Sequence, residues 1–269
     1  MRMRVAHTFA FGSVLLPLAP LWVAIQEEPQ REILFDDFSS STIGLFPDVW
    51  RWRRDRATGD VSKAIRDGVD IFRYVIDGTS SNKYLHVRDE HRPGHSVSLY
   101  LETKKLFSWE IEEFPILSWR WRVNEVPPDA DERYTETNDT PASVLVLYGK
   151  KFPFTPISIK YVWSSTLPVG AVAYRPGRGR PYIIVLGSGT ARLGEWITVE
   201  RNVLEDYVTI FGKAPPERPE AVVISSDANR TPGGVADADY DDFKVLSRYS
   251  DGFPKEPFEL LFEFMEDNR

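Results

Sequence analysis

Short segments of alternating apolar and polar residues run through the chain from residue 31 onward, separated by Gly, Pro, Asn and Asp. Side chains two apart on a β-strand lie on the same face, so this alternation predicts half-buried strands. Many short strands broken by turn residues are typical of an antiparallel sandwich, and the lack of a fixed-period repeat argues against a propeller or a solenoid. The segments predicted as strands are 33–38, 69–76, 84–87, 96–101, 114–123, 142–148, 157–163, 182–186, 196–200, 221–225 and 240–246.

The clearest of these strands reads LSWRWRV over residues 117–123. Its period of two assigns Trp119 and Trp121 to the core and turns Arg120 and Arg122 to the opposite face. We therefore expect the two arginines to face water or a groove.

One helix interrupts the strand pattern. Within 201–211 the apolar residues recur at helical spacing, and Gly212 ends the helix. A second short helix is expected at 258–265. No linker marks a second domain, so we expect one sandwich domain over 32–249 and a C-terminal tail over 250–269.

The first residues have the pattern of an export signal. Arg2 and Arg4 precede a mostly apolar run over 5–25, and Glu27 follows it. Residues 1–26 are therefore predicted to be a signal peptide or an uncleaved N-terminal anchor, and both alternatives stay open. In either case the rest of the chain is exported to the periplasm or the medium.

Composition excludes several classes of protein. The chain has 269 residues, of which 42% are hydrophobic and 27% charged, and this argues against disorder and a multi-span membrane protein. It contains no Cys, so disulfides, thiolate metal sites and a Cys nucleophile are excluded. A formal net charge of −7 argues against binding to nucleic acid.

Several strings in the sequence resemble a known family when their order and spacing are taken together. They are LSWRWRV (117–123), ND (138–139), YVW (161–163), EW (195–196), RNVLEDYVTIFG (201–212), SSDAN (225–229) and DYDDF (239–243). Over about residues 35 to 245 the chain is similar to the bacterial family called domain of unknown function 3047. The resemblance implies a secreted or periplasmic jelly-roll β-sandwich, similar in outline to carbohydrate-binding modules, and it implies no activity.

The chain departs from the family pattern at two places. The family usually has a second acidic residue where Asn138 stands, and Asp-Asn-Thr where residues 228–231 stand. Both departures weaken a metal-binding role for these positions.

Two acidic pairs stand in the first and last predicted strands, Asp36-Asp37 and Asp241-Asp242. In sandwiches of this outline those strands commonly lie side by side, and four adjacent carboxylates would repel unless a cation with oxygen ligands neutralised them. A structural Ca²⁺ bound by these residues is one prediction. In the alternative, one Asp of each pair is solvated and the other caps a turn.

A basic row is predicted on the outward side of the central strands. The candidate ligand-binding residues are Arg120, Arg122, Lys160, Asp139, Asp227 and Asn229. A guanidinium group binds carboxylate, sulfate or phosphate through two parallel hydrogen bonds, which suits an acidic glycan. In the alternative, the arginines pair with Asp139, Asp227 or Glu200 in a structural network.

Tryptophan is abundant, and aromatic faces can stack on sugar rings. Trp119, Trp121, Trp163 and Trp196 are assigned to the core. Trp50 and Trp52 flank Arg51 in a segment that follows a proline, and they are the candidates for an exposed stacking surface.

No catalytic residue is assigned. A polysaccharide lyase could use His as a base with Tyr and Arg, and His86, His91 and His95 lie close together in what the pattern indicates is a loop. A solvated hairpin is the more ordinary explanation of these residues. No nucleophile elbow, phosphate loop or dinucleotide motif is present.

The sequence therefore predicts an exported, non-catalytic module that binds an envelope or extracellular polysaccharide, with Arg120 and Arg122 suited to an acidic one. Two alternatives stay open. The first is a polysaccharide lyase or glycoside hydrolase on the same scaffold, and the second is an envelope domain that binds a protein through its C-terminal helix. Membrane contact is expected only through an uncleaved N-terminal segment.

Overall fold

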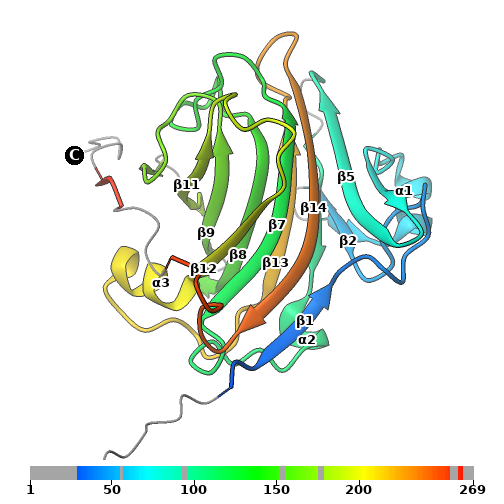
Figure 1. Cartoon of the computed structure of the whole chain (residues 1–269). Coiled ribbons are helices and arrows are strands. Elements are labelled where there is room, and N and C mark those ends of the chain that lie inside the picture. Colours follow the sequence, from blue (N-terminus) through cyan, green and yellow to red (C-terminus); the bar gives the residue numbers. More distant parts are fainter. Residues whose placement is uncertain are drawn as a thin grey trace, which may run out of the picture.

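Two β-sheets pack face to face in this computed structural model, which describes residues 29–54, 57–92, 96–151, 155–174, 179–254 and 260–262 (Figure 1). Sheet A runs in the order β12 (Ile197–Asn202), β7 (Ile116–Glu125), β14 (Val235–Leu246), β5 (Asn82–Glu90) and β4 (Tyr74–Thr79). β1 (Glu32–Asp36) pairs with the second half of β14. The first and last strands thus lie side by side, as predicted.

Sheet B forms the second layer. Its order is β10 (Val172–Tyr174), β11 (Tyr182–Ser188), β9 (Thr155–Ser164), β8 (Thr140–Lys151), β13 (Ala221–Asp227), β6 (Ser98–Leu101), β2 (Arg51–Arg54) and β3 (Ala57–Gly59). Its strands pair antiparallel except for β9 and β11, which pair in parallel because β10 makes the return. The predicted antiparallel jelly-roll sandwich is confirmed.

Large aromatic side chains fill the space between the sheets. Trp119 and Trp121 of β7 are 0% and 1% exposed. Their rings contact Tyr161 and Trp163 of β9 in the facing sheet, at centroid distances of 5.9 Å and 6.3 Å. The predicted burial of both indoles is confirmed, and it orients every other side chain of β7.

The helix α3 (Val203–Phe211) matches the predicted segment and starts two residues later. The Asn202 side chain accepts a hydrogen bond from the backbone N–H of Glu205 at 3.0 Å, and Gly212 ends the helix at φ 66°. Tyr207 of this helix packs its ring on Tyr148 at 4.6 Å, which docks the helix on one end of the sandwich. The short helices α1 (Val61–Asp67) and α2 (Thr103–Leu106) were not predicted.

A β-bulge in β14 changes the alternation that the sequence suggests. Tyr240 and Phe243 are both 0% exposed, although strict alternation puts residues three apart on opposite faces. The pairing with β7 shifts between Asp241 and Lys244, and Asp242 has φ 53°. The bulge therefore leaves two successive carboxylates, Asp241 and Asp242, on the side of the sheet away from the core.

The stacking surface predicted at Trp50 and Trp52 is wrong. Both side chains are buried, at 2% and 0% exposure, because β2 joins sheet B beside β6 with these indoles on the core side. The Trp50 indole N–H donates to Asp36 and the Trp52 indole N–H donates to the Asp60 carbonyl. Both indole N–H groups thus have hydrogen-bond acceptors, and both rings are packed in the core.

The two ends of the chain lie largely outside the described residues. The predicted leader over 1–26 is not among them, and of the predicted helix over 258–265 only 260–262 are. There Leu261 forms a parallel β-bridge with Ala171 and no α-helix. None of the helices in the described ranges has the length and apolar character that crossing a membrane requires.

The core arrangement predicts a large cost for removing one central indole. Trp121→Ala should lower the free energy of unfolding by about 3–5 kcal/mol, since the cavity between the sheets can relax only in part. Denaturant unfolding checks this value against Leu45→Ala, because Leu45 is 57% exposed and its loss should cost little. A Trp121 variant no less stable than the Leu45 variant would contradict the two-layer core.

Candidate functional site

The face of sheet A that points away from the core carries Arg120 and Arg122; we call it the outer face. Because Trp119 and Trp121 point inward, these arginines point outward, with side chains 31% and 25% exposed. Their predicted orientation is confirmed.

A row of side chains crosses this outer face from strand to strand. Val75 of β4 stands opposite His86 of β5, His86 opposite Asp239 of β14, and Asp239 opposite Arg122 of β7. His86 Nδ1 lies 2.8 Å from Asp239 Oδ1, and Arg122 Nε donates to Asp239 Oδ2 at 2.8 Å. The amide of Asn124 donates to the same Oδ2 at 2.9 Å. Asp239 is therefore the shared acceptor at the centre of the face.

A second row lies beside the first. Arg120 Nη2 donates to Asp241 at 2.6 Å, and Arg120 Nε lies 2.6 Å from Asp242. The bulge of β14 makes both contacts possible, since it presents the two carboxylates in succession to one guanidinium group. Together the contacts of Arg120 and Arg122 with Asp239, Asp241 and Asp242 form what we call the Arg–Asp ladder.

Two aromatic rings lie over the ladder. The guanidinium carbons of Arg120 and Arg122 lie 5.2 Å and 4.9 Å from the ring centroid of Trp196, and Arg122 also lies 5.1 Å from that of Tyr84. The rings of Tyr84 and Trp196 meet edge to face at 5.5 Å. Both side chains are half-buried, so each keeps part of its surface open to solvent.

The prediction that Trp196 belongs to the core is wrong. Ile197 and Val199 of β12 stand opposite Trp121 and Trp119 and share their inward direction. Trp196 precedes Ile197 and therefore has the opposite phase. The prediction placed Trp196 on the inward-facing side of its strand, but the inward positions are Ile197 and Val199. The indole of Trp196 therefore lies on the outer face and not in the core.

The buried carboxylates of the ladder have shifted pKa values. Burial, together with the charge of Asp242, raises the pKa of Asp241 to about 6, although Arg120 acts in the opposite direction. Burial also tends to raise the pKa of Asp239, but hydrogen bonds from His86, Asn124 and Arg122 outweigh it and lower the value. The hydrogen bond to Asp239 raises the pKa of His86.

A pocket of about 400 Å³ opens beside the central row, over β4 and β5. His86 and Arg88 line it, and so does Phe72, whose side chain is 69% exposed. Arg88 donates to Asp237 of β14 at 2.8 Å, and His86 of the same pocket lies 2.8 Å from Asp239, so the pocket is hydrogen-bonded to the ladder through His86. The outer face thus combines exposed aromatic rings with fixed donors and acceptors.

Lys160 does not belong to the predicted basic row. It lies on β9 in sheet B, where Tyr161 and Trp163 point into the core toward Trp119 and Trp121. Lys160 therefore faces away from the core on the opposite side of the sandwich from the two arginines. Sequence alternation shows which residues share a face of one strand, but not which sheet the strand joins.

Asp139, Asp227 and Asn229 lie on the Lys160 side, not beside the arginines. Asp139 is fully buried and accepts hydrogen bonds from the backbone N–H groups of the loop after β13. Asn229 donates through its side-chain amide to Asp227, whose pKa burial raises to about 6 while Lys160 acts to lower it. The contacts of these residues hold a loop in place.

Glu132 is buried in the same region. Its Oε2 accepts a hydrogen bond from Ser164 at 2.7 Å, and within the described part of the chain Oε1 has no hydrogen-bond partner. Burial raises the pKa of Glu132 to about 7. A carboxyl held in this way titrates close to neutral pH.

The four carboxylates predicted to bind Ca²⁺ do not converge. Asp36 accepts from the Phe38 N–H and the Trp50 indole on the core side, and Asp37 accepts from Ser39. Asp241 and Asp242 contact Arg120 on the outer face, as described above. In the described ranges no group of three or more acidic or His residues is arranged to hold a metal ion. The arrangement therefore does not fit a cation site made from these residues.

The strings LSWRWRV and DYDDF supply the two sides of the ladder, on β7 and β14 respectively. Residues 72–244 match the model of a family described as "Protein of unknown function (DUF3047)". This chain belongs to the DUF3047 family. The resemblance drawn from the sequence is thereby confirmed.

Solved structures similar to this DUF3047 chain include carbohydrate-binding modules of Clostridium thermocellum. The family 11 module of cellulosomal cellulase Lic26A-Cel5E has a TM-score of 0.36 and 10% identity, over 80% of this chain and 94% of that one. The family 30 module of cellulosomal cellulase Cel9D-Cel44B has a TM-score of 0.35 and 10% identity, over 69% and 83%. A family 11 module in complex with a β-1,3-1,4-mixed-linked tetrasaccharide has a TM-score of 0.34 and 10% identity, over 80% and 94%. No curated protein matches the chain.

Sequence reasoning missed Tyr84 and His86 as residues of the DUF3047 outer face. His86 belongs to the strand predicted at 84–87 and not to a loop shared with His91 and His95, because β5 runs through it with Leu85 and Val87 buried on the other side. The alternation of Leu85 and Val87 with Tyr84 and His86 in the sequence was the signal that could have placed Tyr84 and His86 on the outer face. His91 follows the strand, and His95 lies outside the described residues.

The pKa of His86 offers a test of the central row. Its folded-state value should lie above 6.5, so the imidazolium stabilises the fold below pH 6.5, and this stabilisation is lost as the pH rises through the folded-state pKa. Asp239→Asn should lower the His86 pKa measured by NMR titration. Asp237→Asn, 3.9 Å from the ring, should lower it less. If Asp239→Asn and Asp237→Asn lowered the His86 pKa equally, the pairing of His86 with Asp239 would be contradicted.

The raised pKa of Glu132 predicts how the free energy of unfolding depends on pH. Its folded pKa of about 7 exceeds the ordinary 4.5, so its contribution is most favourable below pH 4.5 and falls as the pH rises through 7. The difference corresponds to about 3 kcal/mol. Glu132→Gln should therefore raise the Tm at pH 8 and flatten its decline between pH 4.5 and 7 in thermal melts. A variant whose Tm has the wild-type pH profile would refute this assignment.

Proposed function

We propose that this chain is an exported module that binds a polysaccharide on the outer face of sheet A. The observation that carries the proposal is the half-exposed pair of Tyr84 and Trp196 held over the Arg–Asp ladder. Sugar rings stack their apolar faces on aromatic side chains, while their hydroxyls need donors and acceptors in fixed positions. The outer face supplies both within one small area. Export is proposed from the basic start and apolar run at the N-terminus.

The charge on this face favours a neutral polysaccharide. Arg120 and Arg122 each already contact a carboxylate of β14, and Arg88 contacts Asp237. Cationic and anionic groups therefore nearly balance across the face. An acidic chain would have to displace Asp239 and Asp241 from their guanidinium partners, so we propose it as the weaker version of the same function.

Catalysis is the second candidate, and one observation favours it. His86, Tyr84 and Arg122 lie together on the outer face, which is the combination that a polysaccharide lyase requires. However, Nδ1 of His86 lies 2.8 Å from Asp239, and this hydrogen bond raises the pKa of His86 and so favours the imidazolium form, which has no free lone pair for a proton from a sugar carbon. We therefore propose that the face binds polysaccharide without cleaving it.

Binding should depend on the two rings. A glycan array that includes linear β-1,4-glucan and β-1,4-mannuronate identifies the ligand, and calorimetry then compares variants. Trp196→Ala and Tyr84→Ala should each weaken binding about tenfold or more, because each removes a stacking surface. Tyr134→Ala is the matched control: this ring is 48% exposed and lies 5.3 Å from the Arg133 guanidinium, outside the outer face.

Three outcomes separate the alternatives. Unchanged binding by both ring variants would refute the proposed face. Preference for mannuronate over glucan would favour the acidic version. Unsaturated products or new reducing ends after incubation with the ligand, abolished in His86→Ala, would replace binding with catalysis.

A further inference from the structure

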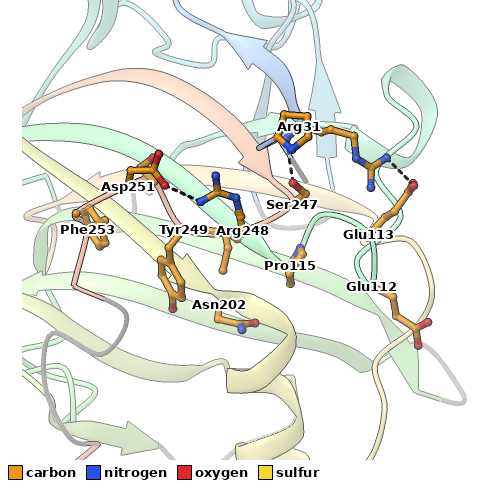
Figure 2. Close-up of a pocket in the computed structure, with 14 residues that line it drawn as sticks. Arg31, Glu112, Glu113, Pro115, Asn202, Ser247, Arg248, Tyr249, Asp251 and Phe253 are labelled. Atoms are coloured by element: carbon orange, nitrogen blue, oxygen red, sulfur yellow. Dashed lines mark hydrogen bonds and ion pairs between the residues drawn. The ribbon is translucent and has the colours of Figure 1, made fainter. Parts of the chain in front are cut away.

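A second pocket, of about 760 Å³, lies where four distant segments of the chain meet (Figure 2). Its walls come from the residues before β1, the turn before β7, the end of β12 and the turn after β14. Its volume falls within the range of pockets that bind small ligands, about 300–1,000 Å³. No role described so far uses this pocket.

The pocket opens on the outer face of sheet A. Ile116 and Asn202, which line it, stand opposite each other on β7 and β12, and by alternation both have the outward phase of Arg120. Ser250 crosses the same face, where its N–H donates to Glu200 at 2.8 Å. From Trp196 to Asn202 the chain runs six residues along β12, or roughly 20 Å. Thr198 of β12 is exposed between Trp196 and the Ser250 crossing, so the aromatic pair and the pocket lie on the same face of the sandwich.

The lining has the same mixed chemistry as the aromatic site. The rings of Tyr249 and Phe253 are parallel within 3°, with centroids 6.1 Å apart, and both side chains are half-buried (Figure 2). Arg31 pairs with Glu113 at 2.8 Å and Arg248 with Asp251 at 2.7 Å. The side chains of Arg31 and Glu113 are each 51% exposed, so this pair contributes little to stability and its polar atoms are accessible to a ligand.

Hydrogen bonds between the segment before β1 and the segment after β14 hold the backbone around the pocket in place. The N–H of Arg31 donates to Ser247 Oγ and the N–H of Ser247 donates to the Arg31 carbonyl, both at 2.9 Å. The amide of Gln30 donates to the Arg248 carbonyl at 2.8 Å. A pocket ordered in advance loses less entropy when a ligand binds.

We propose that this pocket is a second subsite for the polysaccharide, so that one linear chain lies along β12 from Trp196 to Tyr249 and Phe253. The inference rests on the proposed function and deepens it, because it defines the ligand as an internal stretch of a long chain. Opposite charges are paired in both sites, which again suits a neutral chain.

Chain-length dependence tests the second subsite. Calorimetry with β-1,4-glucan oligosaccharides of three and six residues, or mannuronate of the same lengths if the array selects it, should show the longer chain binding about tenfold tighter. Tyr249→Ala and Phe253→Ala should remove that gain and leave the three-residue affinity unchanged. Tyr249→Phe keeps the ring and should keep the gain, and Tyr134→Ala is the control for loss of an unrelated ring.

The outcomes distinguish the inference from the function on which it rests. Equal affinity of the wild-type chain for both lengths would overturn the second subsite and leave the aromatic site standing. Equal loss for both lengths in Tyr249→Ala and Phe253→Ala, with the wild-type Tm retained, would also overturn it. If neither length binds and the array has no hits, the proposed function and the second subsite both fail.

Discussion

Burial of the two indoles of β7 is the constraint on which the rest of the molecule depends. Once Trp119 and Trp121 pack against Tyr161 and Trp163, the strand can present Arg120 and Arg122 only to the other side. The neighbouring β14 then supplies Asp239, Asp241 and Asp242 in register with them. Burial of the indoles in the core thus determines where the charged side chains lie on the opposite face of sheet A.

This polar surface is more than an isolated set of ion pairs. Exposed ion pairs add little stability, but here the side chains of Asp239 and Asp241 are only 1% and 4% exposed, so either charge left without its partner would carry a large desolvation cost. The guanidinium groups of Arg120 and Arg122 therefore stay in contact with the rings of Trp196 and Tyr84. Both rings gain a fixed support and keep part of their surface open to solvent, which suits the sugar stacking that we propose. In our proposal the second pocket adds a further subsite to this surface.

Much of the fold could be predicted from local signals. Alternation gave the orientation of β7, and helical spacing with Gly212 gave the α3 helix. The pairing of the first and last strands followed from what is common in sandwiches of this outline. The site could be predicted only in part. Alternation placed Arg120 and Arg122 outward but could not assign Lys160 to the other sheet, since sheet membership depends on long-range pairing. The predicted phase of β12 was wrong by one residue, which placed Trp196 in the core. The bulge at Asp242 was missed, although the two acidic residues between Tyr240 and Phe243 break the alternation of β14. Burial of Trp50 and Trp52 depended on the pairing of β2 with β6.

The most direct test of this account is an NMR titration of the isotope-labelled chain with the glycan selected by the array. The account predicts that the indole N–H of Trp196 and the Nε–H groups of Arg120 and Arg122 shift in proportion to bound ligand, while signals around Lys160 and Asp227 stay in place. Shifts concentrated around Lys160 and Asp227, with the outer face of sheet A unaffected, would contradict it.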